Sequence, residues 1–167
     1  NACSSPHLIV WLGESQEKAR DRFWAAIYRV VSKKYDLPLV RAVDKFTTLC
    51  QNAIDLDKIK SITRYGNLIY RILMDTLPDN MDTLRGKFGY FYEFDVTDIN
   101  KISHIVNKSF QTLTYFGFNK SYLADFVIQN RLLGIDNITP IGSSLDIGVI
   151  WDGYDIIRSL SRTINVR

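Results

Sequence analysis

The residue best suited to covalent chemistry in this sequence is a cysteine three positions from its start. Cys3 lies among small residues in the stretch Asn1-Ala2-Cys3-Ser4-Ser5-Pro6, which leads into an apolar run. Small neighbours leave a thiol approachable, and the backbone N–H groups of Cys3, Ser4 and Ser5 could face a negative charge that develops on a bound carbonyl oxygen. We therefore regard Cys3 as a candidate nucleophile. The alternative is that Cys3 is a buried small hydrophobe, the commonest fate of a free cysteine.

The remaining cysteine and the two histidines are weaker candidates. Cys50 falls among apolar residues on one face of a predicted helix, so we interpret it as a packing residue. His104 also lies on a predicted helix, where an exposed or hydrogen-bonded imidazole is the ordinary expectation. A cysteine hydrolase or acyltransferase would need His7 or His104 as the base for Cys3. His7 is poorly suited to that task, because it lies four residues further along an extended chain.

Composition and charge exclude several classes of function. The chain has 167 residues, of which 46% are hydrophobic and 23% are charged, as is ordinary for one globular domain. Its net charge of +3 is too small to predict a nucleic-acid partner. Two cysteines and two histidines give neither a disulfide framework nor a metal site, so a reducing cytoplasm is expected. No apolar run is long enough for a membrane span and no secretory leader is visible.

Hydrophobic periodicity predicts strands that alternate with helices along the chain. The predicted strands cover 7–12, 59–74 and 90–96, and residues 137–142 are predicted to form a short strand and a turn. The predicted helices cover 15–35 with Ser15 as its cap, 39–53, 97–113, 119–133 with Asn119 as its cap, and 156–161. This order favours an α/β fold in three layers with a mostly parallel sheet. The alternative is an α+β fold with a two-stranded arm built from residues 60–75.

Four separated stretches resemble one known family. Asn1-Ala2-Cys3-Ser4-Ser5-Pro6 looks like its nucleophile loop, and Gly89-Tyr90-Phe91-Tyr92-Glu93-Phe94 like the strand after its oligomerisation arm. The third stretch, 111–117, contains Gln111-Thr112, and the fourth is 134–142 with the trailing 151–155. Together they are similar to the carboxy-terminal, cysteine-bearing part of acyl-CoA reductases of the bacterial bioluminescence type, the LuxC family of the aldehyde dehydrogenase superfamily. Since the sequence begins at Asn1 rather than Met, we expect a carboxy-terminal piece of a longer reductase.

The resemblance implies an enzyme that reduces long-chain fatty acyl-CoA to fatty aldehyde with NADPH. Cys3 would hold the acyl group as a thioester, which an acyl donor protein could equally supply in place of acyl-CoA, and the backbone N–H groups of Cys3 and Ser4 would stabilise the oxyanion. Phe88, in the Phe-Gly pair before the predicted strand 90–96, would contact the cofactor. The family further implies one catalytic domain over 1–167, a homo-oligomer, and an oligomerisation arm at 60–75.

The chain also departs from the pattern of the superfamily. The general base and the nucleotide-binding domain would lie upstream of Cys3, so we expect this chain alone to lack turnover. The acidic residue that should precede the Phe-Gly pair is replaced by Arg85-Gly86-Lys87, which leaves ordinary packing as an alternative for Phe88. Two other functions therefore stay open. One is a non-catalytic fragment that serves in oligomerisation or interaction, and the other is a cysteine acyltransferase or hydrolase.

Overall fold

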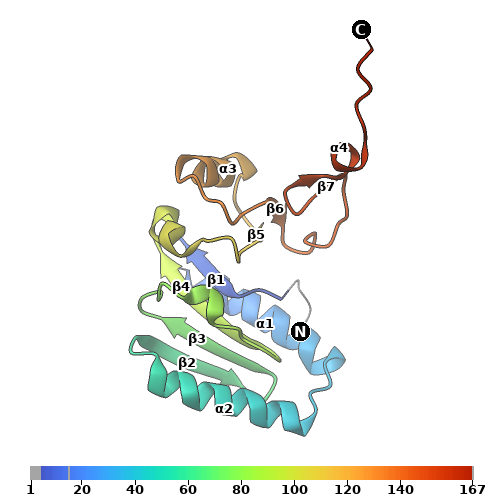
Figure 1. The fold of residues 1–167 in the computed structure, drawn as a ribbon. Coiled ribbons are helices and arrows are strands. Elements are labelled where there is room, and N and C mark those ends of the chain that lie inside the picture. Colours follow the sequence, from blue (N-terminus) through green and yellow to red (C-terminus); the bar gives the residue numbers. More distant parts are fainter. Residues whose placement is uncertain (1–4, 15, 167) are drawn as a thin grey trace. The chain divides into compact units, whose positions relative to one another are not determined.

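The protein divides into two compact units. The computed structural model describes residues 5–14 and 16–166 (Figure 1). The first unit is Asn1–Ile105 and the second is Val106–Arg167. The sequence predicted one domain over 1–167, whereas the structure separates the candidate nucleophile region and the Gln111-Thr112 region into different units. Each unit is therefore described by itself.

A four-stranded, mostly parallel sheet forms the first unit. Its strands are β1 (Leu8–Leu12), β2 (Ile59–Tyr65), β3 (Ile69–Met74) and β4 (Tyr90–Val96), in the order β1-β4-β3-β2. Strand β4 pairs in parallel with both β1 and β3, and only β2 runs antiparallel to its neighbour. The predicted mixed α/β class with a mostly parallel sheet is thus confirmed.

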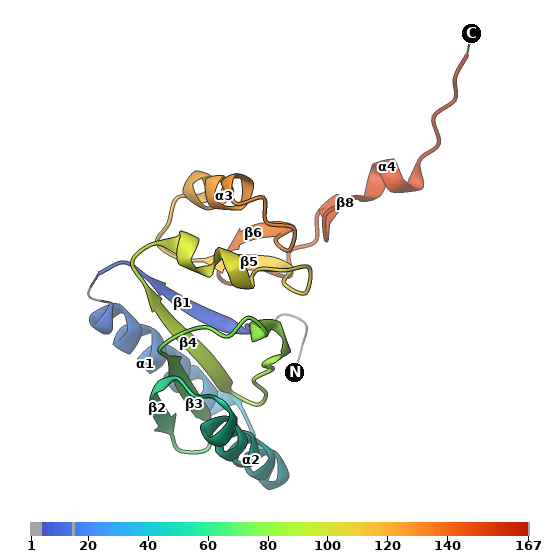
Figure 2. The same ribbon diagram turned by 60° about the vertical axis from the view of Figure 1, so that its left-hand side comes forward.

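Helices cover both faces of this sheet. Helix α1 (Glu17–Lys34) contacts the face that carries Glu93, because the Trp24 indole donates to that carboxylate. Helix α2 (Leu39–Asp55) contacts the opposite face, where Asn52 donates to the hydroxyls of Tyr90 and Tyr92. Successive residues of a strand point to opposite faces, which explains why neighbours in β4 serve different helices. The first unit consequently has three layers, and Figure 2 shows the same elements from a second side.

The residues at the ends of α1 and at the start of α2 explain where these helices begin and end. The predicted cap Ser15 lies outside the described residues, and the cap position of α1 is Gln16, whose side-chain amide donates to the Leu12 carbonyl at 2.7 Å. Lys33 and Lys34 occupy the last turn of α1, where cations favour the negative end of the helix dipole. Pro38 immediately precedes α2, a position where its missing N–H costs no helical hydrogen bond.

The predicted strand 59–74 is two strands joined by a tight turn. Gly66 adopts φ +54° between β2 and β3, a conformation that glycine reaches without strain. All six residues of β3 are buried, and this strand pairs on both sides within the chain. Strand β2 lies at the edge of the sheet. The 60–75 segment expected as an arm therefore contributes one internal strand and one edge strand, and its role in oligomerisation stays a prediction.

The predicted helix 97–113 is wrong. A 3-10 helix, η2 (Ile99–Ile105), is followed by a turn in which the Asn107 side chain accepts from the Ser109 N–H at 2.8 Å. Such a side-chain bond offers the backbone an alternative to helix. Residues 112–115 then form a strand, β5, so the β-branched residues of the Gln111-Thr112 region are extended. A shorter 3-10 helix, η1 (Met81–Thr83), lies between β3 and β4.

The second unit is built around a small parallel pair, β5 (Thr112–Tyr115) with β6 (Asn137–Pro140). Helix α3 (Lys120–Gln129) connects them, and the Asn119 side chain caps it as predicted, although the helix ends four residues before the predicted Leu133. A hairpin of β7 (Ile150–Trp151) and β8 (Tyr154–Asp155) was not predicted. It leads into α4 (Ile156–Leu160).

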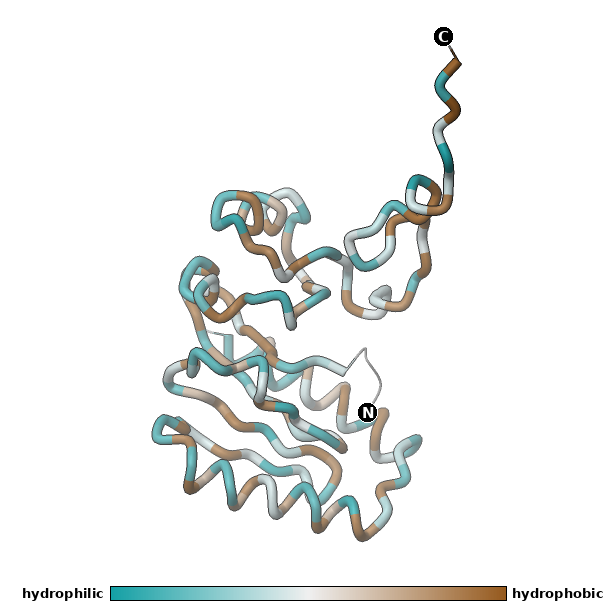
Figure 3. Tube along the Cα trace, viewed as in Figure 1, coloured by the Kyte–Doolittle hydropathy of each residue, from teal (hydrophilic) through white to brown (hydrophobic). Residues whose placement is uncertain are grey.

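Apolar segments recur along the trace of both units in Figure 3. No helix within residues 5–14 and 16–166 combines the length and apolar character that a membrane crossing requires.

Candidate functional site

The candidate nucleophile region is described only from its carboxy-terminal side. Cys3 and Ser4, with the backbone N–H groups expected to stabilise the oxyanion, lie outside the described residues. The described chain begins at Ser5, two positions after Cys3, and enters β1 at Leu8. The residues around the start of β1 are therefore the described residues next to the candidate nucleophile.

The segment that enters β1 contacts the loop that enters β4. Because β1, β3 and β4 are parallel, their first residues lie at the same edge of the sheet. There Nη1 of Arg85 contacts Nε2 of His7. Burial and the positive charge of Arg85 lower the pKa of His7 below its usual value, and Asp82 opposes this only in part. This shift favours the neutral imidazole, whose Nε2 can accept from the guanidinium.

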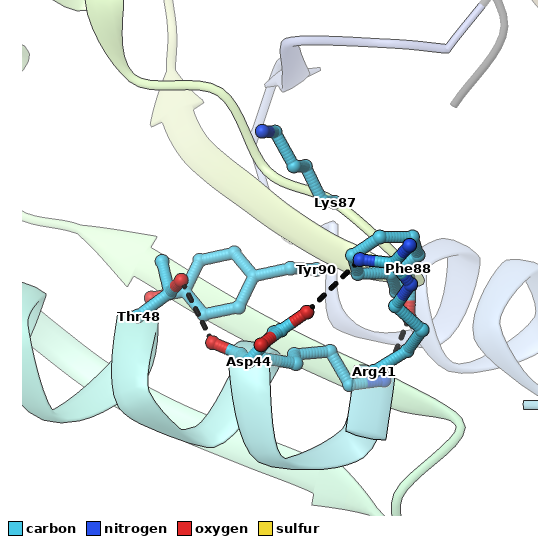
Figure 4. Close-up of a pocket in the computed structure, with 7 residues that line it drawn as sticks. Arg41, Asp44, Thr48, Lys87, Phe88 and Tyr90 are labelled. Atoms are coloured by element: carbon cyan, nitrogen blue, oxygen red, sulfur yellow. Dashed lines mark hydrogen bonds and ion pairs between the residues drawn. The ribbon is translucent and has the colours of Figure 1, made fainter. Parts of the chain in front are cut away.

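The same loop carries Phe88, which lines a pocket of about 190 Å³. Figure 4 shows Arg41, Asp44 and Thr48 of α2 around it, with Lys87 and Tyr90. Lys45 of α2 also lines this pocket. The Arg41 guanidinium lies 4.9 Å from the centre of the Phe88 ring and 3.1 Å from Asp44 Oδ2. Phe88 thus both lines the pocket and packs against Arg41, so the structure admits both interpretations of this residue.

The backbone around Phe88 is held in a rare conformation. Phe88 itself has φ +58° and Gly89 has φ +83°. A non-glycine residue in this region is strained, and such strain persists only where surrounding contacts impose it. A Cβ atom on Gly89 would lie 2.2 Å from the Leu68 carbonyl oxygen, so no other residue fits without movement of the backbone. Gly89 is therefore a structural requirement of this loop.

Lys45 supplies the contacts that hold the loop. Its side chain is 2% exposed, and its ammonium group donates to the carbonyls of Phe88 at 2.7 Å, Leu68 at 3.1 Å and Asn67. The ammonium also lies 4.7 Å from the centre of the Tyr70 ring. Burial, with a smaller effect of Arg64, lowers the pKa of Lys45 to about 8. One buried cation thus joins α2, the β2–β3 turn and the Phe88 loop.

The pocket has an excess of positive charge. Arg41, Lys45 and Lys87 contribute cations, and Asp44 contributes the one carboxylate among the lining residues. A cation-rich wall beside an aromatic ring suits a ligand that combines a planar group with an anion.

The opposite face of the sheet carries a second cluster, centred on Glu93. This carboxylate is 1% exposed and accepts from Arg71 Nε at 2.7 Å, from the Trp11 indole at 2.6 Å and from the Trp24 indole at 3.0 Å. Arg20 Nε lies 3.7 Å from its Oε2 atom. Both carboxylate oxygens are engaged, so we assign Glu93 to stability rather than to acid–base chemistry. Sequence reasoning missed it, because its partners lie far away in the chain.

Two of the predictions for individual residues have definite outcomes. Cys50 is exposed, so its interpretation as a packing residue is wrong. The buried side of α2 carries Lys45, Leu49 and Asn52 instead. His104 is exposed, which is one of the two states expected for it.

The third and fourth stretches of the family resemblance lie together in the second unit. The Gln111 carbonyl accepts from the Asp136 N–H at 3.0 Å and from the Asn137 N–H at 3.3 Å. Gly153 approaches Asp136 so closely that a Cβ atom there would lie 3.0 Å from its carboxylate oxygen. The segments 111–117, 134–142 and 151–155 are therefore neighbours in space.

Comparison of the chain with protein-family models, with curated proteins and with solved structures found no match in any of the three.

Proposed function

We propose that this chain is the acyl-carrying part of a reductase that converts long-chain fatty acyl-CoA into fatty aldehyde. The sequence around Cys3 and the four family-like stretches are the basis of this proposal. The observation that supports it best is the contact between His7 and Arg85. This contact brings the segment that follows Cys3 to the same edge of the sheet as the Phe88 loop. An acyl group on Cys3 and a cofactor bound at Phe88 would then lie at the same edge.

In the proposed reaction the Cys3 thiolate attacks the thioester carbonyl of acyl-CoA. A sulfur–carbon bond to the enzyme forms, the bond to coenzyme A breaks, and coenzyme A leaves as a thiolate. NADPH, when bound, supplies the hydride that reduces the acyl group. The sulfur–carbon bond then breaks, the aldehyde is released and Cys3 returns to the thiolate. The coenzyme A thiolate released earlier takes up one proton from solvent. Sulfur suits both steps, because the thiolate is a strong nucleophile and a good leaving group.

In this proposal the pocket around Phe88 would hold one end of the cofactor. Its ring would contact the nicotinamide nucleoside, while Arg41 and Lys87 would face the adjoining phosphates. Lys45 has its ammonium engaged by three carbonyls and would shape the pocket instead of binding the ligand. Acyl transfer to Cys3 is the step of the proposed reaction that the residues of this chain would carry.

The test is an acylation experiment on the chain. A long-chain acyl-CoA with a terminal alkyne is incubated with the parent, with Cys3→Ser and with Cys50→Ser, and the adduct is mapped by mass spectrometry. We expect a hydroxylamine-labile adduct on Cys3 that Cys50→Ser retains and Cys3→Ser loses. Cys50 is a suitable control because it is exposed, so non-specific acylation would also label it. Equal labelling of Cys50, or no adduct on folded protein, would overturn the proposal.

Cofactor binding needs its own measurement. We expect Phe88→Ala to weaken NADPH binding about tenfold, which corresponds to the loss of one ring contact, as followed by saturation-transfer NMR of the nicotinamide protons. Tyr28→Ala, which removes an exposed ring from α1, is the matched control. Unchanged binding in Phe88→Ala would assign Phe88 to packing alone.

A further inference from the structure

The α1 face of the sheet holds a second pocket, of about 370 Å³. It lies between α1 and β2, and residues of β3 and β4 form its floor. The Phe88 pocket lies on the α2 face, so the sheet separates the two pockets. The reaction proposed above uses none of the residues that line this second pocket.

The wall formed by α1 carries two carboxylates. Glu17 and Asp21 lie four positions apart and therefore on the same side of the helix, with Cβ atoms about 5–6 Å from each other. Burial lowers the pKa of Arg20, and Asp21 and Glu17 are among the charges that raise it, which places both carboxylates near the floor. Both residues are exposed, and within the described part of the chain neither forms an ion pair or a side-chain hydrogen bond. They are therefore available to a ligand.

The wall formed by β2 carries hydroxyl groups and an aromatic ring. Ser61, Thr63 and Tyr65 are alternate residues of the strand, so their side chains share the face that lies toward α1. The Tyr65 ring lies 5.4 Å from the ring of Tyr28 of α1, so the two walls meet at this end. Ser61 and Thr63 are exposed, and neither hydroxyl has a hydrogen-bond partner in the described part of the chain. This wall thus offers two free hydroxyls.

The floor of the pocket compensates its own charges. The Arg71 guanidinium donates to Glu93 through Nε at 2.7 Å and through Nη2 at 3.4 Å. Arg20 forms an ion pair with Asp95, and its Nε lies 3.7 Å from Glu93 Oε2. Leu73 adds a buried apolar side chain to the floor. Two guanidinium groups therefore face two carboxylates, and the unpaired charge of the pocket lies on the α1 wall.

The sign of this charge excludes an anion as the ligand. The lining residues carry three carboxylates against two guanidinium groups. Beside the pocket, Lys60 lies 3.8 Å from Asp95, and their opposite charges leave the negative excess unchanged. An anion would meet both free carboxylates and would gain only the Nε of Arg20, which is buried without a hydrogen-bond partner. A cation with several N–H donors suits these walls.

We propose that this pocket binds a linear aliphatic diamine. One ammonium group would face Glu17 and the other Asp21, and the free hydroxyls of β2 would accept their remaining N–H groups. Four methylene groups separate the two nitrogens of such a ligand by about the distance between these carboxylates. The methylene chain would lie along Leu73 and the Tyr65 ring, as the stem of a lysine lies along an apolar surface. The proposal does not rest on the chemistry at Cys3, so the two can fail separately.

The first test is a titration of the isotopically labelled chain with 1,4-diaminobutane, followed by amide NMR at constant ionic strength. We expect saturable shifts confined to residues 17–21, 61–65 and their neighbours in β3 and β4. Glu17→Gln and Asp21→Asn should each raise the dissociation constant about fivefold, the upper range for an exposed ion pair. Asp125→Asn, at an exposed position of α3, is the matched control. An equal effect of Asp125→Asn would mean general attraction to negative charge and would overturn the proposal.

The second test asks whether both carboxylates act on one ligand. 1-Aminobutane lacks the second ammonium group and should bind the parent about fivefold more weakly than 1,4-diaminobutane. In Asp21→Asn the second ammonium group has lost its partner, so the two affinities should come within about twofold of each other. A preference for the diamine that Asp21→Asn leaves unchanged would contradict the proposed arrangement.

The third test fills the pocket from within. Thr63→Lys supplies an ammonium group on the β2 wall and should weaken binding of 1,4-diaminobutane about tenfold or more. Ile62→Lys adds the same charge at the next residue, whose exposed side chain lies on the other face of the strand, and should have little effect. Circular dichroism establishes that each variant is folded. Equal weakening by the two lysines, or no saturable binding to the folded parent, would overturn the proposal. Binding of a lysine-rich peptide without binding of the free diamine would overturn it as well.

Discussion

The ammonium nitrogen of Lys45 lies 2.7 Å from the carbonyl oxygen of Phe88, and this contact holds the strained backbone of the candidate cofactor loop against α2. We expect Lys45→Met to lower the free energy of unfolding by about 2–4 kcal/mol, because three buried carbonyls lose a charged donor at once. Denaturant titration measures this loss. Lys87→Met removes the exposed lysine of the same pocket, and we expect it to stay within about 0.5 kcal/mol of the parent. Equal stability of the two variants would contradict the role assigned to Lys45.

The same lysine predicts a dependence of stability on pH. Its pKa falls from the ordinary 10.5 to about 8 on folding, so between these values the unfolded chain binds more protons than the folded chain. The contribution of Lys45 to stability therefore increases as the pH rises from about 8 to 10.5. The difference in unfolding free energy between the parent and Lys45→Met, measured at several pH values, should change over this window. A constant difference would show that the lysine does not titrate there.

Two buried tyrosines predict the opposite trend at higher pH. Burial raises the pKa of Tyr90 and of Tyr92 above the usual 10.0, so above pH 10 the folded chain binds more protons than the unfolded chain. Their contribution to stability is complete below pH 10 and is lost as the pH rises further. We expect Tyr90→Phe to lose stability less steeply than the parent between about pH 10 and 11. Absorbance of phenolate beside circular dichroism would show whether ionisation and unfolding coincide.

Gly89 and Gly66 form a matched pair for backbone strain. Both have positive φ, but a Cβ atom on Gly89 would collide with the Leu68 carbonyl, whereas one on Gly66 meets nothing within 4 Å. We expect Gly66→Ala to cost about 1–2 kcal/mol from conformation alone. Gly89→Ala should cost more, by at least the same amount again, since the loop must also move. Thermal melting of the two variants side by side measures the two losses of stability. An equal loss would mean that the loop around Gly89 can move without a cost in free energy.

Glu93→Gln tests the cluster on the α1 face. The substitution keeps the size of the side chain but removes the charge that compensates Arg71, which is itself buried. Breaking one side of a buried ion pair costs about 3–5 kcal/mol, so a large loss of stability is expected. Glu14→Gln, at an exposed position before α1, should change little. A mild effect of Glu93→Gln would indicate that water or a neighbouring group takes over the role of the carboxylate.

The sequence predicted correctly those elements that are marked by a hydrophobic run or by helical spacing within the element itself. The apolar run before Gly13 predicted β1, the aromatic run Tyr90–Val96 predicted β4, and the three-and-four spacing after Glu17 predicted α1. The helix expected through Leu113 failed because the Asn107 side chain forms its own turn. The strand expected over 59–74 was divided by a turn at Gly66 that nothing in the hydrophobic pattern marks.

The orientation of α2 shows a further limit of periodicity. The pattern of Val43, Phe46 and Cys50 identifies an apolar face correctly but does not say what covers it. Lys45 is buried because carbonyls from three distant residues meet its ammonium group, and those residues have no signature near position 45. For the same reason Glu93 was missed, since its donors come from β1, α1 and β3. Phe88 was found from a family-like motif, and its contact with a cofactor stays a prediction, as does the chemistry at Cys3.

The parallel pairing of β1 with β4 has a consequence for the order in which the protein folds. Leu8 pairs with Tyr92, so β1 finds its neighbour in the sheet only after most of the first unit has been synthesised. Contacts between residues so far apart in sequence require closure of a long loop and form slowly. The hairpin of β2 and β3 can form early, because its strands are adjacent in the chain. The strand that follows Cys3 is thus expected to be among the last to dock, and a nascent chain would present that segment to the cell for longer than any other part of the first sheet.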